Sequence, residues 1–339
     1  MKFSITTTFA ALSGLALASA GGFADCDPTG AAEHTTGPFG SPNTFETTDA
    51  DGTIFKVTLP DTKSDTKVPL VVFMHGSTGQ WEFYSDNLEL MASHGAAVVF
   101  PFIKSPDDDK HFWVTNTDGT YLIKAIEYAR AAAQDEGSAL YGRVDLDNII
   151  IAGHSMGATC SINASLKLKD DPAVKLTLTM HPGICGPFGP PPCPSCWKKE
   201  SMEEIAGARP LIFTTATNDG AFWPAPQTAV HEYGCFKGAV GDGDEQVEGL
   251  ENLAFVQFSE EVCTEDGNRE PLVDDAGHDC ITKKLEDGDA PEFELALKAV
   301  KLYGQLGGDE TSMCWSMIYG DDANSLKMSN TTDLLDIRV

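Results

Sequence analysis

The stretch IIIAGHSMGATC, residues 149–160, decides the fold of this chain. Its first half is a run of β-branched residues, which is typical of a buried strand, and its second half consists of small residues that favour a helix. Between the halves, Ser155 stands between Gly153 and Gly157 in the pattern G-x-S-x-G. The glycines lack the Cβ atoms that would clash where strand and helix nearly touch. A serine at such a turn is exposed at the end of its strand and is placed to act as a nucleophile.

The rest of the chain alternates between strand and helix patterns. Apolar or alternating runs predict strands at 53–60, 69–76, 96–102, 148–153, 174–180, 210–217 and 253–259. Apolar residues at helical spacing predict helices at 83–95, 118–133, 156–169, 225–234 and 291–304. This alternation predicts an α/β fold, namely a doubly wound, mainly parallel sheet with helices on both faces.

The sequence divides into four segments. Residues 1–20 combine a lysine, an apolar stretch and small residues before position 21, which is typical of a secretory signal peptide. Residues 21–52 are rich in Gly, Thr, Pro and Asp without periodicity and predict an irregular N-terminal arm. The strand and helix patterns fill residues 53–320, and residues 321–339 form a C-terminal tail.

The composition is strongly acidic. The 339 residues include 51 Asp and Glu against 23 Lys and Arg, a formal net charge of −28. Such a field repels nucleic acid and anionic membranes, and it suits a neutral or cationic substrate. Beyond residues 1–20 no stretch approaches the length of a membrane span. We therefore expect a secreted monomer that neither binds nucleic acid nor spans a membrane.

The nine cysteines predict disulfides in an oxidising compartment, with one cysteine left over. Cys160 is the predicted free thiol, because it lies on a small-residue helical face behind Ser155. Cys193 and Cys196 form a CxxC pattern, but their Pro-rich surroundings favour a structural disulfide loop over a redox centre. No second pair or histidine lies at zinc-ligand spacing, so we expect no metal.

Ser155 needs a general base, and the base needs a carboxylate that orients it. Asp219 ends RPLIFTTATND, at the carboxyl end of a predicted strand. His278, in DDAGHDC, follows the last predicted strand and is the expected base. His231 lies within a predicted helix, and His181 follows the wrong strand for this role. The alternative interpretation makes Asp219 a turn or cap residue and His278 a surface histidine.

Acyl transfer also needs hydrogen-bond donors for the oxyanion that develops. The backbone N–H of Met156, directly after Ser155, is the first expected donor. The second is the N–H of Ser77 in HGSTG, the loop after the strand at 69–76. Such chemistry requires no organic cofactor.

With these residues identified, the chain resembles the α/β-hydrolase superfamily over about residues 53–320. The segments YGRVDLDNIIIAGHSMG (141–157) and RPLIFTTATNDGAFWP (209–224) resemble bacterial-type cutinases and polyester hydrolases of its dienelactone-hydrolase-like branch. The segment HGSTGQWEFYSDNLELMASHGAAVVFP (75–101) resembles chlorophyllases at least as closely. The resemblance implies an α/β-hydrolase catalytic domain with Ser155, Asp219 and His278 as its triad.

The resemblance also implies disulfides. It pairs Cys280, just after the histidine, with Cys314, so that the catalytic loop is tied to the C-terminal segment. Cys235 would pair with Cys263 across the insertion before His278. Polyester hydrolases usually carry an aromatic residue where Ser77 stands, and this departure weakens a polyester assignment.

Together these features predict a secreted serine carboxylic ester hydrolase, similar to cutinases, that forms an acyl-enzyme from a small or polymeric ester. A chlorophyllase is the first alternative, and a lipase or phospholipid acetylhydrolase is the second. A non-catalytic α/β-hydrolase module that only binds a partner is the alternative outside the enzymes.

Overall fold

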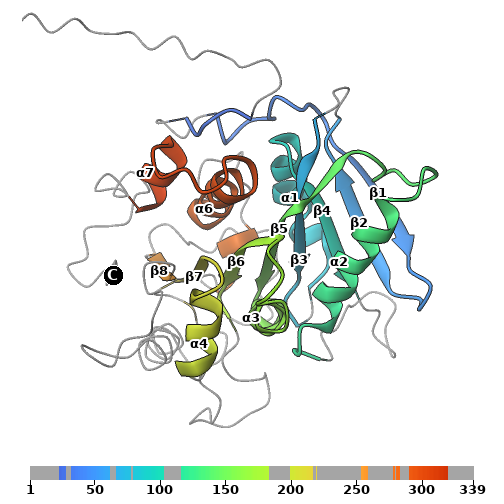
Figure 1. Ribbon diagram of the computed structural model, residues 1–339. Coiled ribbons are helices and arrows are strands. Elements are labelled where there is room, and N and C mark those ends of the chain that lie inside the picture. The colour runs from blue at the N-terminus through green and yellow to red at the C-terminus, as the bar shows by residue number, and fades with distance from the viewer. Residues whose placement is uncertain are drawn as a thin grey trace, which may run out of the picture.

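The described part of the chain forms one α/β fold, seen in a computed structural model (Figure 1). The structure describes residues 23–27, 32–61, 66–77, 79–102, 116–182, 199–216, 219, 253–258, 278, 280–282 and 290–319. Its centre is one mostly parallel sheet, and helices pack on both faces of that sheet. The predicted α/β class is therefore confirmed.

The sheet consists of β1 Asn43–Thr48, β2 Ile54–Leu59, β3 Val68–Met74, β4 Ala97–Phe102, β5 Val144–His154, β6 Val174–Met180, β7 Leu211–Ala216 and β8 Leu253–Phe258. Their order across the sheet is β1-β2-β4-β3-β5-β6-β7-β8. β2 is antiparallel to both of its neighbours, and all pairs from β4 to β8 are parallel. The carboxyl ends of the parallel strands therefore lie along one edge of the sheet, where chemistry concentrates in such folds.

The central strands are rich in apolar residues because both faces of the sheet are covered. β3, β4 and β7 are buried along their whole length, so their sequences show no polar alternation. β5 is longer than predicted, since it begins at Val144 with the half-exposed segment that precedes the apolar run. The buried part of β5 leads directly to Ser155.

The helices are α1 Ser85–Ser93, α2 Thr120–Ala132, α3 Met156–Lys167, α4 Lys199–Ala206, α6 Pro291–Val300 and α7 Met313–Tyr319, with a 3₁₀ turn η1 Trp81–Phe83 and a π-helical turn η6 Lys301–Gln305. On one face of the sheet, Leu88 of α1 and Phe293 of α6 join a shared core. On the other face, Leu122 of α2 and Ala164 of α3 belong to a second core. Two cores separated by the sheet are the arrangement that a doubly wound sequence pattern predicts.

Three elements were not predicted. β1 lies within residues 21–52, so the expectation of an irregular arm is wrong for Asn43–Thr48. This edge strand is mostly half-exposed and pairs with β2 alone, which is why it lacks an apolar run. α4 and α7 are helices of only eight and seven residues, too short for a pattern over several turns to be recognised. The predicted helix at 225–234, the signal peptide at 1–20 and the tail at 321–339 lie outside the described residues.

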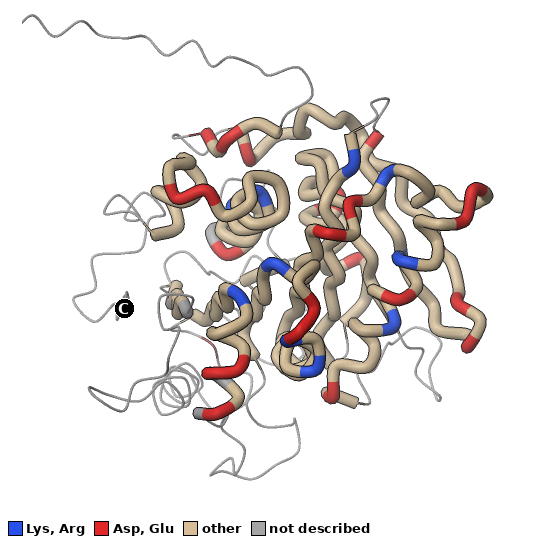
Figure 2. Tube along the Cα trace, in the orientation of Figure 1, with Lys and Arg blue, Asp and Glu red and all other residues tan. Residues whose placement is uncertain are grey.

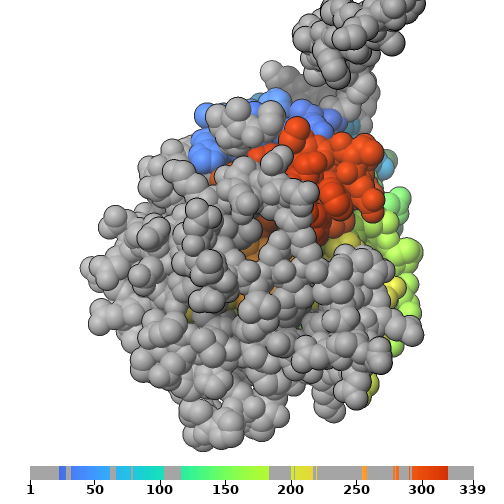
Figure 3. Space-filling model, turned by 90° about the vertical axis from the view of Figure 1, so that its left-hand side faces the viewer, coloured from blue at the N-terminus to red at the C-terminus, as the bar shows by residue number. Residues whose placement is uncertain are grey.

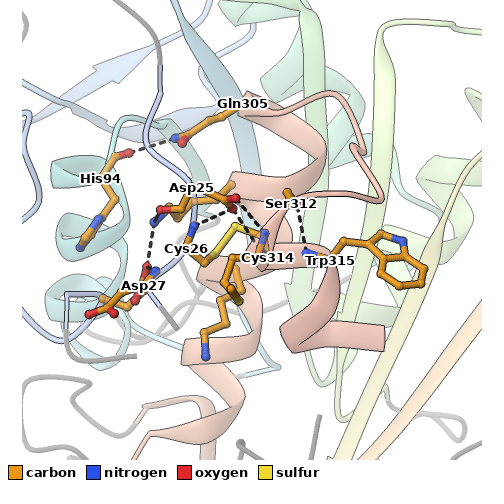
Figure 4. Close-up of a disulfide and its surroundings, with 12 residues drawn as sticks. Asp25, Cys26, Asp27, His94, Gln305, Ser312, Cys314 and Trp315 are labelled. Carbon is orange, nitrogen blue, oxygen red and sulfur yellow. Dashed lines mark hydrogen bonds and ion pairs between the residues drawn. A yellow bond between two sulfur atoms is a disulfide. The ribbon is translucent and has the colours of Figure 1, made fainter. Parts of the chain in front are cut away.

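The expected disulfide between Cys280 and Cys314 is wrong. Cys314 pairs with Cys26 instead, across a sequence separation of 288 residues (Figure 4). Cys280 is also disulfide-bonded, and its partner lies outside the described residues. The resemblance could not reveal this pairing, because Cys26 belongs to the N-terminal arm, which the resemblance does not cover. The predicted pair of Cys235 with Cys263 and the loop with Cys193 and Cys196 are also outside the described residues.

The N-terminal arm packs against the C-terminal helices, as the adjacent blue and red segments show (Figure 3). The Asp25 carboxylate accepts hydrogen bonds from the backbone N–H groups of Met313 and Cys314, at 2.8 and 3.1 Å, and so caps α7. Glu33 and Lys301 form a buried ion pair of 2.7 Å beside this disulfide. Disulfide, cap and ion pair together join the two ends of the fold.

Lys and Arg residues are interspersed with more numerous Asp and Glu residues along the described trace (Figure 2). Several form surface ion pairs, such as Arg130 with Asp171 at 2.7 Å, and such pairs contribute little to stability. No helix in the described part of the chain is long and apolar enough to cross a membrane.

Candidate active site

Ser155 is the single residue between β5 and α3, as the G-x-S-x-G pattern predicts. Its φ of 56° and ψ of −122° are a strained conformation for a residue with a side chain. The Ser155 N–H donates to the Met180 carbonyl at 2.8 Å, which fixes the turn against the end of β6. The side chain is almost fully buried in the fold. Ser155 thus stands at a sharp strand-to-helix turn, the geometry expected of a nucleophile elbow.

Gly153 and Gly157 have no room for a side chain. A Cβ at Gly153 would overlap the carbonyl of Gly157, and a Cβ at Gly157 would overlap the carbonyl of Met74. Helix α3 therefore starts in direct backbone contact with β5 and with the end of β3. This contact holds Ser155 at the carboxyl edge of the sheet.

Asp219 and His278 meet as predicted. His278 Nδ1 donates to Asp219 Oδ2 at 2.9 Å, and the Asp219 side chain is fully buried. Asp219 follows β7 and His278 follows β8 along the chain, so both reach the carboxyl edge where Ser155 lies. A carboxylate on Nδ1 orients the ring and leaves Nε2 as the proton-accepting nitrogen.

His278 lies directly against the elbow. Its carbonyl oxygen is 2.7 Å from Nε2 of His154, the residue before Ser155, and the two imidazole ring centroids are 4.9 Å apart. His154 was not predicted to have a role beyond its place in the motif. Its position at the end of a buried strand was the available signal.

His181 belongs to the same cluster, although the sequence argument set it aside. Its Nδ1 donates to Asp219 Oδ2 at 2.7 Å, so one carboxylate oxygen accepts from two histidines. Like Ser155, His181 has a positive φ, of 49°, at the end of a parallel strand. His181 follows a different strand from His278, the expected base. It nevertheless lies at the same edge of the sheet and contacts Asp219, the expected acid.

The other nitrogen of His181 faces a second carboxylate, that of Glu292 on α6. His181 Nε2 and Glu292 Oε2 are 3.2 Å apart, at ion-pair distance but without hydrogen-bond alignment. Glu292 Oε1 accepts a short hydrogen bond from Thr214 Oγ1 of β7. The side chains of His181 and Glu292 are fully buried, so their charges are screened little by solvent.

The pKa values of His181 and Asp219 are both shifted from their ordinary values. Burial alone would lower the pKa of His181, but the Glu292 charge and the hydrogen bond to Asp219 outweigh it and raise that pKa well above its usual value. Burial would raise the pKa of Asp219, but the charge of His278 and the hydrogen bond from His181 lower it. Both shifts favour the charged forms, a carboxylate at Asp219 and an imidazolium at His181.

The two residues predicted to supply oxyanion donors, Met156 and Ser77, belong to segments that adjoin Ser155. Met156 is the first residue of α3, so its N–H has no carbonyl partner one turn earlier in that helix. Gly76 is so close to the elbow that a Cβ added to it would lie 3.2 Å from the Ser155 Cβ. Ser77, the next residue, is half-buried in the same turn. The loop thus places Gly76, the residue before Ser77, next to Ser155.

Tyr84 and His154 connect the Ser77 loop to His278. The Gly76 N–H donates to the Tyr84 hydroxyl at 3.2 Å, and that hydroxyl lies 2.8 Å from His154 Nδ1. With Nε2–H of His154 donated to the His278 carbonyl, Nδ1 accepts the proton of Tyr84. Three buried hydrogen bonds therefore run from the Ser77 loop to the backbone of His278.

Two more buried residues fix these loops. Asn87 of α1 donates its Nδ2–H to the carbonyl of Ile281 at 2.9 Å, which holds the segment after His278. His75 Nδ1 donates to the Gly76 carbonyl at 2.6 Å. Burial lowers the pKa of His75 to about 4, so this imidazole stays neutral.

One cluster has the composition of a metal site. Ligand-type atoms of His181, Asp219 and His278 lie within 4.8 Å of one another. Each histidine donates Nδ1–H to Asp219, however, so these contacts are explained as hydrogen bonds between an acid and two imidazoles. In the described group of Asp25, Cys26 and Cys314, the two sulfur atoms are bonded to each other.

Cys160 is free and fully buried, as predicted, and burial raises the pKa of its thiol to about 12. The insertion before His278, at about residues 260–276, lies outside the described residues. In comparisons with known proteins, no family model and no curated protein sequence matches this chain.

Proposed function

We propose that this chain is a serine carboxylic ester hydrolase with an α/β-hydrolase fold. The observation that carries the proposal is the 2.9 Å contact of His278 Nδ1 with Asp219 beside a serine in a strained elbow. The order serine, acid, histidine along the chain and the position of the Ser77 loop after β3 support the same fold. The geometry favours the triad over the interpretation of Asp219 and His278 as isolated turn and surface residues.

The proposed reaction has two halves. His278 Nε2 takes the proton of Ser155 while Oγ forms a bond to the ester carbonyl carbon, and the N–H groups of Met156 and Ser77 stabilise the oxyanion. The imidazolium then gives its proton to the departing alcohol as the ester bond breaks. Water, deprotonated by His278, attacks the acyl-enzyme, and the acid leaves as Ser155 regains its proton. In both halves, Asp219 holds His278 in the tautomer that has its proton on Nδ1, and it stabilises the positive charge of the imidazolium.

Secretion is the second part of the proposal. The Cys26–Cys314 disulfide supports it, because such bonds persist in oxidising compartments. The signal-like pattern of residues 1–20 supports it from the sequence. Expression with residues 1–20 in a secreting host should give medium-borne protein that begins near Gly21, and intracellular retention of the full chain would contradict this part.

The experiment for the activity is hydrolysis of p-nitrophenyl butyrate by the full chain and by Ser155→Ala. We expect turnover by the wild type, a loss of at least about 10³-fold in Ser155→Ala, and fluorophosphonate labelling of the wild type alone. Ser161→Ala is the matched control, since Ser161 is a buried serine on α3 whose hydroxyl only donates to the Gly157 carbonyl. A folded wild type with neither turnover nor labelling would favour the non-catalytic binding module.

The substrate class needs a panel, because Ser77 provides no aromatic ring beside the serine. We propose short acyl esters as the first substrates, as in cutinase-like esterases. Short-chain nitrophenyl esters, cutin or polyester film, chlorophyll and phospholipid acetyl esters form the panel. Preference for chlorophyll or for a lipid would replace the cutinase-like assignment by one of the alternatives while keeping the triad.

A further inference from the structure

His181 and Glu292 form a buried charged contact that the reaction above does not use. We propose that the two are positioning residues of the ester hydrolase: they hold Asp219 in place and put a fixed positive charge beside His278. This inference rests on the proposed function and extends it from three residues to five. Neither residue touches the substrate in this proposal, and both act through Asp219 and His278.

The first support is the shared oxygen. Asp219 Oδ2 accepts from Nδ1 of His181 at 2.7 Å and from Nδ1 of His278 at 2.9 Å. The two donors follow different strands, so the carboxylate is held from two directions. A carboxylate that must keep one orientation is better fixed by two donors than by one, because rotation would break both bonds. His181 thus orients Asp219, as Asp219 orients His278.

The second support is the way Glu292 is held. It lies in the first turn of α6, where the helix dipole favours a carboxylate, and Thr214 binds its other oxygen. A fully buried carboxylate is costly unless a cation compensates it, and the described structure provides His181 at 3.2 Å. Glu292 therefore stabilises the protonated form of His181, in agreement with the raised pKa of that histidine.

The third support is the distance to the base. The ring centroid of His181 lies 5.4 Å from that of His278 and 5.9 Å from that of His154. The charged or titratable groups around His181 in the described structure are thus Asp219, Glu292, His154 and His278. A nearby cation opposes protonation of His278, so the base stays available in mildly acidic solution. Glu292 lies beside Nε2 of His181, whereas Asp219 accepts from Nδ1 on the other side of the ring. The negative charge of Glu292 therefore offsets the positive charge of His181 only in part at His278.

The test compares Glu292→Gln with Glu294→Gln in the full chain. The first substitution keeps the shape of the side chain but removes its charge, so His181 loses its proton within the assay range. We expect the acid limb of the kcat/KM profile for p-nitrophenyl butyrate to move up by about one pH unit, a loss of about tenfold on the acid side and little change near pH 9. Glu294, on the same helix, pairs with His34 and Lys298, and its variant should keep the wild-type limb.

Two further variants separate positioning from simple structural support. His181→Asn removes the charge but keeps a donor, and it should shift the acid limb in the same direction as Glu292→Gln. Glu292→Asp restores the carboxylate and should return the limb toward the wild-type position. If Glu292→Gln and Glu294→Gln have identical acid limbs despite equal stability, the pair is only structural and the inference fails.

A measurement on the wild type needs neither variants nor activity. In protein labelled with ¹³C-histidine, the C2 proton of His181 should keep the shift of an imidazolium between pH 5 and pH 9. Titration of His181 near its ordinary value overturns the inference, whether or not the protein hydrolyses esters. Absence of turnover together with a non-titrating His181 would instead reject the hydrolase and retain the charged pair.

Discussion

His154 Nε2 and the carbonyl oxygen of His278 lie 2.7 Å apart, so the strand that carries the serine also holds the loop that carries the base. The contact is the last of three hydrogen bonds that begin at Gly76 and pass through Tyr84. Because all three groups are buried, water cannot replace a missing member of the chain. The Ser77 loop and the segment of His278 are therefore coupled through Tyr84 and His154, two side chains outside the proposed triad.

Tyr84→Phe should reduce activity without unfolding the protein. It removes the acceptor of the Gly76 N–H and the donor to His154, so the Ser77 loop and the His278 backbone lose their connection. We expect kcat/KM for p-nitrophenyl butyrate to fall by about tenfold, and stability by about 1–2 kcal/mol. Tyr303→Phe is the matched control, since it breaks the hydrogen bond of 2.8 Å to Tyr319 away from the site. Equal kinetics of the two variants would contradict the coupling.

Gly157→Ala should destabilise the fold by about 3 kcal/mol or more, because its Cβ would overlap the Met74 carbonyl. Gly142→Ala is the comparison: Gly142 has a φ of 67° but open space around it, so only the conformational cost of about 1 kcal/mol applies. Urea denaturation measures both. A smaller effect at Gly157 than at Gly142 would show that α3 does not press against β3.

The sequence predicted the parts of this protein that depend on local pattern. Strand β6, matched at both ends, is recognisable because Val174, Leu176, Leu178 and Met180 alternate with lysine and threonine. The elbow was predictable because its glycines are required by local backbone contact. β1 was not, since a half-exposed edge strand has neither an apolar run nor clear alternation.

The missed features of the site depend on tertiary contacts. His181 and Glu292 are 111 positions apart, and nothing in either local sequence indicates the other. Glu292 looks like an ordinary acidic residue in the first turn of a helix, a position that the helix dipole favours in any case. The partner of Cys314 was missed for the same reason, because Cys26 lies in an arm without a periodic pattern.

Cys26→Ser should lower the free energy of unfolding by about 2–5 kcal/mol, because the disulfide closes a loop that spans most of the chain. The triad residues do not contact it in the described structure, so activity at low temperature should persist. Cys160→Ala, which removes a free thiol, should cost only about 1 kcal/mol. Peptide mapping under non-reducing conditions should find Cys26 joined to Cys314, and a Cys280–Cys314 peptide would refute the structure here.

The Cys160 thiol should be unreactive in the folded protein. Burial raises its pKa to about 12, so almost no thiolate exists at pH 8, and the side chain is inaccessible. Iodoacetamide at pH 8 should leave Cys160 unmodified under native conditions and modify it after unfolding in urea without a reductant. Rapid native modification would mean that α3 opens away from the sheet.

Stability should fall as the solution is acidified below the ordinary pKa of histidine, and His75 is a specific cause. The pKa of His75 is about 4 in the folded state and about 6.5 in the unfolded state. Above pH 6.5 both states are neutral; between 6.5 and 4 only the unfolded state binds the proton, so stability is lost as pH falls through this window. The loss approaches about 3 kcal/mol near pH 4.

His75→Asn should be less stable at pH 7 but should lose less stability on going to pH 4.5, as measured by urea denaturation at both pH values. A wild type and a variant with the same pH dependence would show that His75 is protonated within the fold.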